Sequence, residues 1–126
     1  MENFIINKTK HIPLIVLDYK NSNLLIKGES YPENALAVYK PLLEKLDEYF
    51  VNEKKSLFID IYVDYLNTSS SKMMSDMIMK LQNFFEEGHK IELKWYYPLD
   101  DEDCKEACEL FLEDVNFQYQ IIEQDY

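Results

Sequence analysis

Residues 57–85 read LFIDIYVDYLNTSSSKMMSDMIMKLQNFF, and they combine two different hydrophobic periods joined by a short polar segment. From Leu57 to Tyr65 the apolar residues recur at every second position, which is typical of a strand that is buried on one face. From Met73 to Phe85 they recur every three or four positions, which is typical of an amphipathic helix. The sequence therefore predicts a strand over 56–65, a hydroxyl-rich turn, and a helix over 72–87.

The rest of the chain predicts further elements on both sides of this unit. A hairpin followed by alternating helices and strands indicates an α/β domain with a mixed sheet. Strands that alternate in polarity favour helices packed mainly on one face of that sheet. Pro41 falls inside the first helical pattern and is expected to kink or split that helix. The predicted elements are a short edge strand over 4–7, a hairpin over 12–19 and 24–27, helices over 32–50 and 103–115, and strands over 90–97 and 117–122.

Length and composition limit the kinds of protein that this chain can be. The 126 residues are expected to form one domain, residues 1–126, and the 47% of hydrophobic residues is typical of a packed core. A net charge of −11 disfavours nucleic acid and anionic membrane surfaces as partners, because both carry negative charge. No signal peptide or membrane-spanning run is apparent, so a cytoplasmic location is expected.

Three groups of residues are candidate chemical sites, and each favours a structural interpretation. Cys104 and Cys108 share the apolar face of a predicted helix, which favours two buried, reduced thiols over metal ligands. The acidic run Asp100–Asp103 precedes that helix, as capping residues do. Asp60 and Asp64 lie about 13 Å apart along one strand, too far for a carboxylate pair in hydrolysis. No base accompanies the hydroxyls, so we expect no catalysis. A zinc site would need two ligands besides the cysteines, and His11 and His89 are isolated in sequence, so we expect no metal, and no cofactor.

The methionines of the predicted helix over 72–87 leave two interpretations open. Met77 lies on the apolar stripe of that helix, whereas Met79 lies off it. Most of these side chains are expected in the core, but exposed methionine is common on adaptable binding surfaces. The helix therefore has a core face and a candidate partner surface.

The hydroxyl-bearing residues Thr68–Ser71 lie where this helix is expected to begin. Free backbone N–H groups and the positive end of the helix dipole favour an anion there. A single Ser or Thr before a helix is usually a cap, but four in succession exceed what one cap needs. The turn is therefore a candidate acceptor of a phosphate group, and capping is the alternative.

Three segments together resemble the SiaC-type regulatory phosphoproteins. The first reads GESYPENA at residues 28–35 and continues as YKPLL at 39–43. The second reads YLNTSSSK at residues 65–72. The third combines WYY at 95–97 with DDED at 100–103 and EA at 106–107. The resemblance covers residues 12–122, nearly the whole chain.

The resemblance implies a fold like the STAS domain of anti-sigma-factor antagonists and a role in partner switching. In this family the threonine of the Asn-Thr-Ser-Ser turn, here Thr68, is phosphorylated by a serine/threonine kinase of the histidine-kinase-like ATPase class. A PP2C-type phosphatase removes the phosphate. The unmodified protein is expected to bind and activate a diguanylate cyclase, which links cyclic di-GMP signalling to biofilm and aggregation control. Lys45 and Cys108 depart from the family pattern, where relatives tend to carry tryptophan and glycine.

The expected site follows from this resemblance and from the turn itself. Thr68 is the predicted phosphate acceptor, and Ser69 and Ser70 are the alternative acceptors. Lys72, one helical turn after Thr68, could approach the phosphate. A constitutive adaptor without a phosphate cycle is the alternative function. The predicted partner-binding residues are Asn67, Thr68, Ser69, Ser70, Lys72 and Met73.

Overall fold

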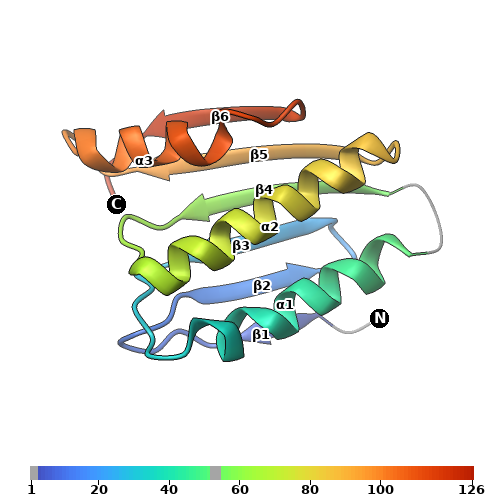
Figure 1. Cartoon of the computed structure of the whole chain (residues 1–126), viewed down its shortest axis with the longest axis horizontal. Helices are drawn as coiled ribbons and strands as arrows, with labels where there is room; N and C mark the ends of the chain where they lie inside the picture. Colours follow the sequence, from blue (N-terminus) through green and yellow to red (C-terminus); the bar gives the residue numbers. More distant parts are fainter. Residues whose placement is uncertain (1–2, 52–54) are drawn as a thin grey trace.

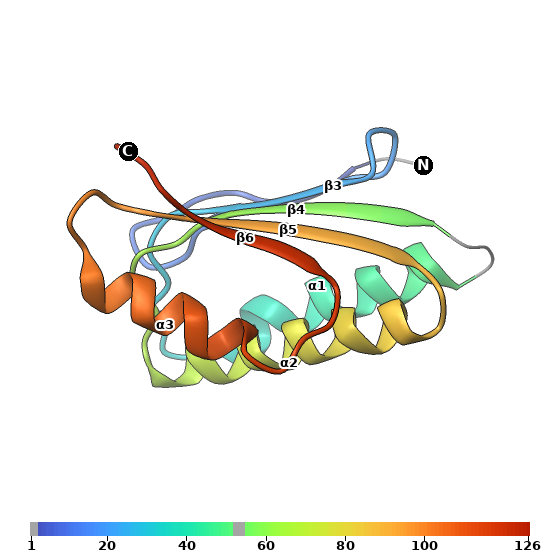
Figure 2. The same ribbon diagram turned by 90° about the horizontal axis from the view of Figure 1, so that it is seen from above.

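A six-stranded mixed sheet covered by three helices on one face makes up the fold of the computed structural model (Figures 1 and 2). The structure describes residues 3–51 and 55–126. The strands lie side by side in chain order. They are β1 (Phe4–Ile6), β2 (Leu14–Asp18), β3 (Asn23–Lys27), β4 (Ser56–Tyr62), β5 (Lys90–Tyr97) and β6 (Gln118–Glu123).

The direction of the strands explains why the helices share one face. The β1–β2 and β2–β3 pairs are antiparallel, whereas β3, β4, β5 and β6 run parallel to one another. Each parallel connection passes through one helix: α1 (Ala35–Phe50), α2 (Thr68–Glu86) or α3 (Glu102–Leu112). Crossovers between parallel strands are nearly always right-handed, so successive strands added on one side bring every helix to the same face. The predicted mixed sheet with helices on one face is confirmed (Figure 2).

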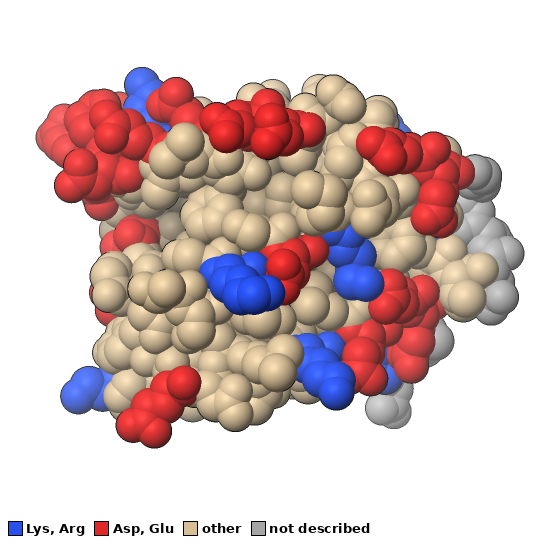
Figure 3. Space-filling model, in the orientation of Figure 1, with Lys and Arg blue, Asp and Glu red and all other residues tan. Residues whose placement is uncertain are grey.

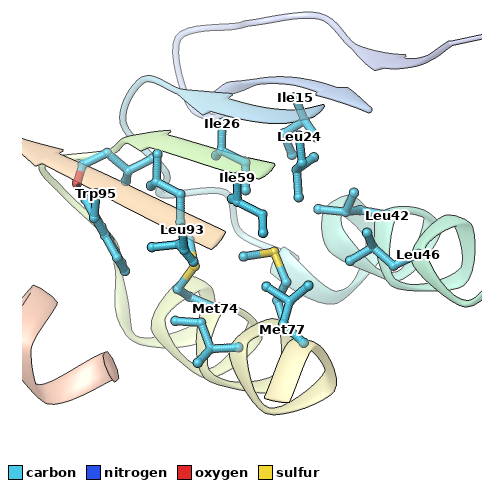
Figure 4. Close-up of a cluster of buried hydrophobic side chains, with 14 of the residues drawn as sticks. Ile15, Leu24, Ile26, Leu42, Leu46, Ile59, Met74, Met77, Leu93 and Trp95 are labelled. Atoms are coloured by element: carbon cyan, nitrogen blue, oxygen red, sulfur yellow. Dashed lines mark hydrogen bonds between the residues drawn. The ribbon is translucent and has the colours of Figure 1, made fainter. Parts of the chain in front are cut away.

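The core lies between the helices and the covered face of the sheet. Figure 4 shows Leu42 and Leu46 of α1 and Met77 of α2 pointing toward the side chains of the sheet. Alternate residues of the strands face them, as the period of two requires, and Ile59 and Leu93 are at most 1% exposed. The sheet residues labelled in the figure are Ile15, Leu24, Ile26, Ile59, Leu93 and Trp95.

Among the described residues, no helix covers the other face of the sheet (Figure 2). Asp60 of β4 lies opposite Lys94 of β5 in the register, and its carboxylate accepts a hydrogen bond of 3.1 Å from the Asn23 amide. The rings of Tyr62 and Tyr96 stack with centroids 4.3 Å apart. Aromatic stacking thus stabilises the pairing of β4 and β5 on the open face.

Several predicted boundaries were wrong by a few residues. Helix α2 begins at Thr68 and not at Lys72, because the Asn67 side chain caps it. Strand β4 ends at Tyr62, three residues before the predicted Tyr65. Helix α1 begins at Ala35, after Asn34 as its cap. Strand β5 spans the predicted residues, whereas α3 and β6 shift by one to three residues.

Pro41 does not split the first helix, which continues unbroken from Ala35 to Phe50. Gly88 follows the end of α2 with a φ of 103°, and its N–H bonds to the Phe85 carbonyl, which confirms the predicted helix stop. Within residues 3–51 and 55–126, no helix is long and apolar enough to cross a membrane.

Candidate regulatory site at the start of helix α2

Thr68 is the first residue of α2, and its side chain is exposed. The preceding residue, Asn67, has an extended backbone, and its Oδ1 accepts a hydrogen bond of 2.9 Å from the Ser70 N–H. The N–H groups of Thr68 and Ser69 open the helix and therefore have no carbonyl partner within it. An anion on the Thr68 side chain would lie at the positive end of the helix dipole.

The start of α2 is held by the segment that precedes α1. The Asn67 Nδ2 donates to the Pro32 carbonyl at 3.0 Å, and the Asn67 N–H donates to the Ser30 carbonyl at 2.9 Å. Ser30 in turn donates its N–H to the Tyr65 carbonyl at 2.9 Å. These bonds join the first and second segments of the family motif in space and fix the backbone that leads into Thr68.

A buried hydroxyl cluster lies directly beneath this backbone. The Ser30 Oγ is 2.6 Å from the Tyr39 Oη and 2.8 Å from the Ser70 Oγ. Ser30 and Ser70 are fully buried, and Tyr39 is 2% exposed. Burial raises the pKa of the Tyr39 phenol, and the hydrogen bond with Ser30 partly opposes this rise. Sequence reasoning missed this cluster, because its members are up to 40 residues apart and nothing in their spacing relates them.

Two residues predicted for the surface belong to the interior instead. Ser70 faces the Ser30 hydroxyl, so it is not an accessible alternative acceptor. Met73 is 5% exposed and packs in the core, so it is not part of a partner surface. A helical turn that starts at Thr68 directs its third and sixth residues inward. Thr68 and Ser69 remain as the exposed hydroxyls of this turn, together with the exposed Lys72.

Lys72 lies one helical turn after Thr68. Its ammonium group forms an ion pair with Asp76, with an N–O distance of 3.1 Å, and both side chains are exposed. Exposed pairs of this kind contribute about 0–1 kcal/mol, so little free energy opposes a change of partner. Lys72 can therefore reorient toward a negative group on Thr68.

The remaining candidate residues have structural roles. Cys104 and Cys108 are buried free thiols, as expected, and hydrogen bonding to Cys104 together with burial raises the pKa of Cys108. The Asp101 Oδ1 accepts from the Cys104 N–H at 3.0 Å and caps α3, which confirms the capping interpretation of the acidic run. Among the described residues, no group of three or more His, Cys, Asp or Glu side chains could hold a metal ion.

The residues that depart from the family pattern lie on other helices than Thr68. Lys45 lies on α1 and pairs with Glu48 at 3.1 Å, and Cys108 lies on α3.

The predicted division of the methionines is also confirmed. Met74 and Met77 are at most 1% exposed, whereas Met79 is 56% exposed. The exposed surface of α2 thus includes one large apolar side chain.

Comparison with known proteins gives the same family as the sequence motifs. A family model described as SiaC family regulatory phosphoprotein matches residues 6–124. The chain is 30% identical over 125 residues to an uncharacterized protein of Pseudomonas aeruginosa strain UCBPP-PA14, with 99% of each chain covered.

Solved structures of SiaC from Pseudomonas aeruginosa have the same fold. One is 29% identical with a TM-score of 0.92, and the match covers 98% of this chain and all of that one. A second comes from the complex of the diguanylate cyclase SiaD with its activator SiaC, and it is 30% identical with a TM-score of 0.92, covering 96% and 99% of the two chains. With a family model over nearly its whole length, this chain belongs to the SiaC family of regulatory phosphoproteins.

Proposed function

We propose that this chain is a partner-switching regulator, without enzymatic activity of its own, that is reversibly phosphorylated on Thr68. A kinase of the histidine-kinase-like ATPase class adds the phosphate, and a PP2C-type phosphatase removes it. The unmodified form binds and activates a diguanylate cyclase and so influences biofilm formation. The ATP that the kinase needs sets this cycle in the cytoplasm. Support comes from the family, and from the solved complex in which SiaC is the activator of the diguanylate cyclase SiaD.

The observation that carries the proposal is the contrast between Thr68 and Ser70. Both hydroxyls belong to the first turn of α2, but Thr68 is exposed whereas Ser70 is fully buried. A kinase must reach the hydroxyl, and the added group must find room outside the core. Thr68 meets both requirements without any change in the fold, and the backbone around it is held by Asn67 and Ser30.

Phosphorylation would act on the interface rather than on the fold. The phosphate adds about −1.5 to −2 charges and three acceptor oxygens. The helix dipole would stabilise such a group by about 0.3–1 kcal/mol, and Lys72 can approach it. A partner that covers a neutral Thr68 hydroxyl would instead have to bury a dianion, at a cost of about 3–5 kcal/mol without a compensating charge. Each 1.4 kcal/mol is about a tenfold change in affinity, so binding would weaken by a factor of about one hundred or more.

Identification of the phosphorylated residue tests this function. The purified protein is incubated with ATP and with a serine/threonine kinase of the histidine-kinase-like ATPase class from the same genome, and the phosphate is located by tandem mass spectrometry. We expect one phosphate on Thr68, none on the Thr68→Ala variant, and full labelling of the matched Ser69→Ala variant. Undiminished labelling of Thr68→Ala, or phosphate on Ser69 in the wild-type protein, would contradict the proposal.

A further inference from the structure

Strand β6 forms one edge of the sheet, and one side of its backbone has no strand partner. In the part of the chain that the structure describes, no strand lies beyond β6, whereas β5 pairs with all of its six residues. The Gln124 N–H, just after β6, donates to the Tyr97 carbonyl of β5. Backbone groups alternate between the two sides of a strand, so Tyr119, Ile121 and Glu123 direct their N–H and C=O groups away from β5. A further strand can pair with this row of groups.

The two edges of the sheet differ in their protection against strand pairing. Proteins usually protect an edge strand by making it short or by placing lysine, proline or a bulge in it. The opposite edge, β1, has only three residues. Strand β6 has six residues, reads QYQIIE, contains neither lysine nor proline, and pairs with β5 without a bulge. It is therefore the edge that is open to an added strand.

A shallow hollow of about 630 Å³ lies beside this edge, between β6 and α3. Tyr119 of β6 lines it, and every charged side chain that lines it is a glutamate of α3: Glu106, Glu109 and Glu113. Tyr119 lies opposite Leu93 in the register, and Leu93 is buried beneath the helices, so both side chains are on the helix-covered face. Alternate side chains of a strand added to β6 would point to the same face and reach this hollow.

The charge at this end of the molecule determines which strand it accepts. Residues 99–126 contain ten acidic side chains and one lysine, which gives a net charge of −9 out of −11 for the chain. Figure 3 shows acidic side chains crowded over α3 and along the adjacent rim of the molecule. A second copy that paired through its own β6 would bring the same charges and would be repelled. A strand with lysine or arginine would be attracted.

The spacing of the glutamates is compatible with the period of a strand. A helix rises about 1.5 Å per residue, so Glu106 and Glu113 lie about 10.5 Å apart along α3, with Glu109 between them. Alternate side chains of a strand are about 7 Å apart. Two basic residues separated by one position can therefore both reach the three carboxylates, while the residue between them points to the other face of the sheet.

We infer that β6 docks an extended segment of a partner protein, which adds a strand to the sheet and carries lysine or arginine at the alternate positions that face α3. Backbone hydrogen bonds provide the affinity of such strand addition, and the alternate side chains provide its specificity. This surface goes beyond the proposed function. Thr68 lies on α2, which contributes neither the strand nor the glutamates, so the inference does not depend on the phosphate switch.

Binding of a synthetic peptide tests the charge complementarity. The probe is an amidated peptide of four Lys-Val repeats with a fluorescent label at its N-terminus, and its affinity for the full chain is measured by fluorescence anisotropy. We expect the probe to bind, and to bind at least tenfold more weakly when all three glutamates of the hollow are replaced by glutamine. A matched control variant, which should bind within twofold of the wild type, carries the same change of charge at exposed positions away from β6: Glu29→Gln, Glu33→Gln and Glu44→Gln.

Two modified peptides test the backbone pairing, one N-methylated on every lysine and the other on every valine. The N–H groups of an added strand alternate between β6 and solvent. We therefore expect one modified peptide to bind at least tenfold more weakly than the probe, and the other to bind like it. Amide hydrogen exchange, followed by NMR, should slow at Tyr119, Ile121 and Glu123 when the probe binds.

Absence of probe binding, equal affinities of the two N-methylated peptides, or an equal loss in the two triple variants would overturn the inference. A dimer of the wild-type protein, detected by sedimentation equilibrium and protecting the same three amides without peptide, would also overturn it by making a second copy the occupant. The test uses neither phosphate nor a cyclase, so its failure is distinct from a failure of the proposed switch.

Discussion

Replacement of Ser30 by alanine should destabilise the protein more than replacement of either of its hydroxyl partners. The Ser30 Oγ is the common partner of the Tyr39 and Ser70 hydroxyls, which are both buried. Ser30→Ala removes both hydrogen bonds and leaves two buried polar groups unpaired. At about 1–3 kcal/mol for each unpaired group, the free energy of unfolding should fall by about 2–6 kcal/mol.

Replacement of Tyr39 or of Ser70 should lower the free energy of unfolding by less, because Ser30 keeps one hydrogen-bond partner in each variant. Tyr39→Phe and Ser70→Ala each remove one hydrogen bond, worth about 1 kcal/mol. Urea denaturation followed by circular dichroism measures all three variants, with Ser75→Ala on the exposed side of α2 as the control. The control should change stability by no more than about 0.5 kcal/mol. A loss in Ser30→Ala that is no larger than in Ser70→Ala would refute the idea that Ser30 is the centre of the cluster.

Three further predictions concern the cap, the buried phenol and the thiols. Asn67→Ala should lower the free energy of unfolding in urea by about 1–2 kcal/mol through loss of the cap, and Asn67→Asp, which keeps the acceptor, should recover most of it. Burial raises the pKa of the Tyr39 phenol above 10.0, so the phenol ionises at a lower pH in the unfolded chain than in the folded one. The free energy of unfolding should therefore fall as pH rises above about 10, and it should fall less steeply in Tyr39→Phe. Cys104 and Cys108, which are buried, should react with Ellman's reagent much faster in denaturant than in the native protein.

Hydrophobic periodicity was sufficient to predict the order of elements. The alternation in β4 and β5 and the helical spacing after Met73 reflect burial on one face, which any strand or helix of this sheet must satisfy. The start of α2 was predicted too late, because Thr68–Ser71 contain no apolar residue and so do not show the helical period. Asn67, directly before them, caps the helix. Pro41 was expected to kink or split α1; the helix is not split, and Leu42 and Leu46, which follow Pro41, are fully buried in the core.

The candidate site was predictable only in part. The hydroxyl turn and the motif around Thr68 are local, so the sequence indicates them directly. The anchoring of Asn67 to Pro32 and the contact between Ser30 and Ser70 depend on tertiary structure, since the paired residues are 35 and 40 positions apart. Met79, the methionine that falls off the apolar stripe, was the one signal in the sequence of an exposed apolar side chain on α2.

The affinity of the diguanylate cyclase for the unmodified protein and for the protein phosphorylated on Thr68 tests the account most directly. Isothermal titration calorimetry with the two forms, prepared side by side and verified by mass spectrometry, gives both dissociation constants. We predict that phosphorylation weakens binding by a factor of about one hundred or more, because the interface must bury a dianion in place of a hydroxyl. Equal dissociation constants for the two forms would contradict the account and would favour a constitutive adaptor.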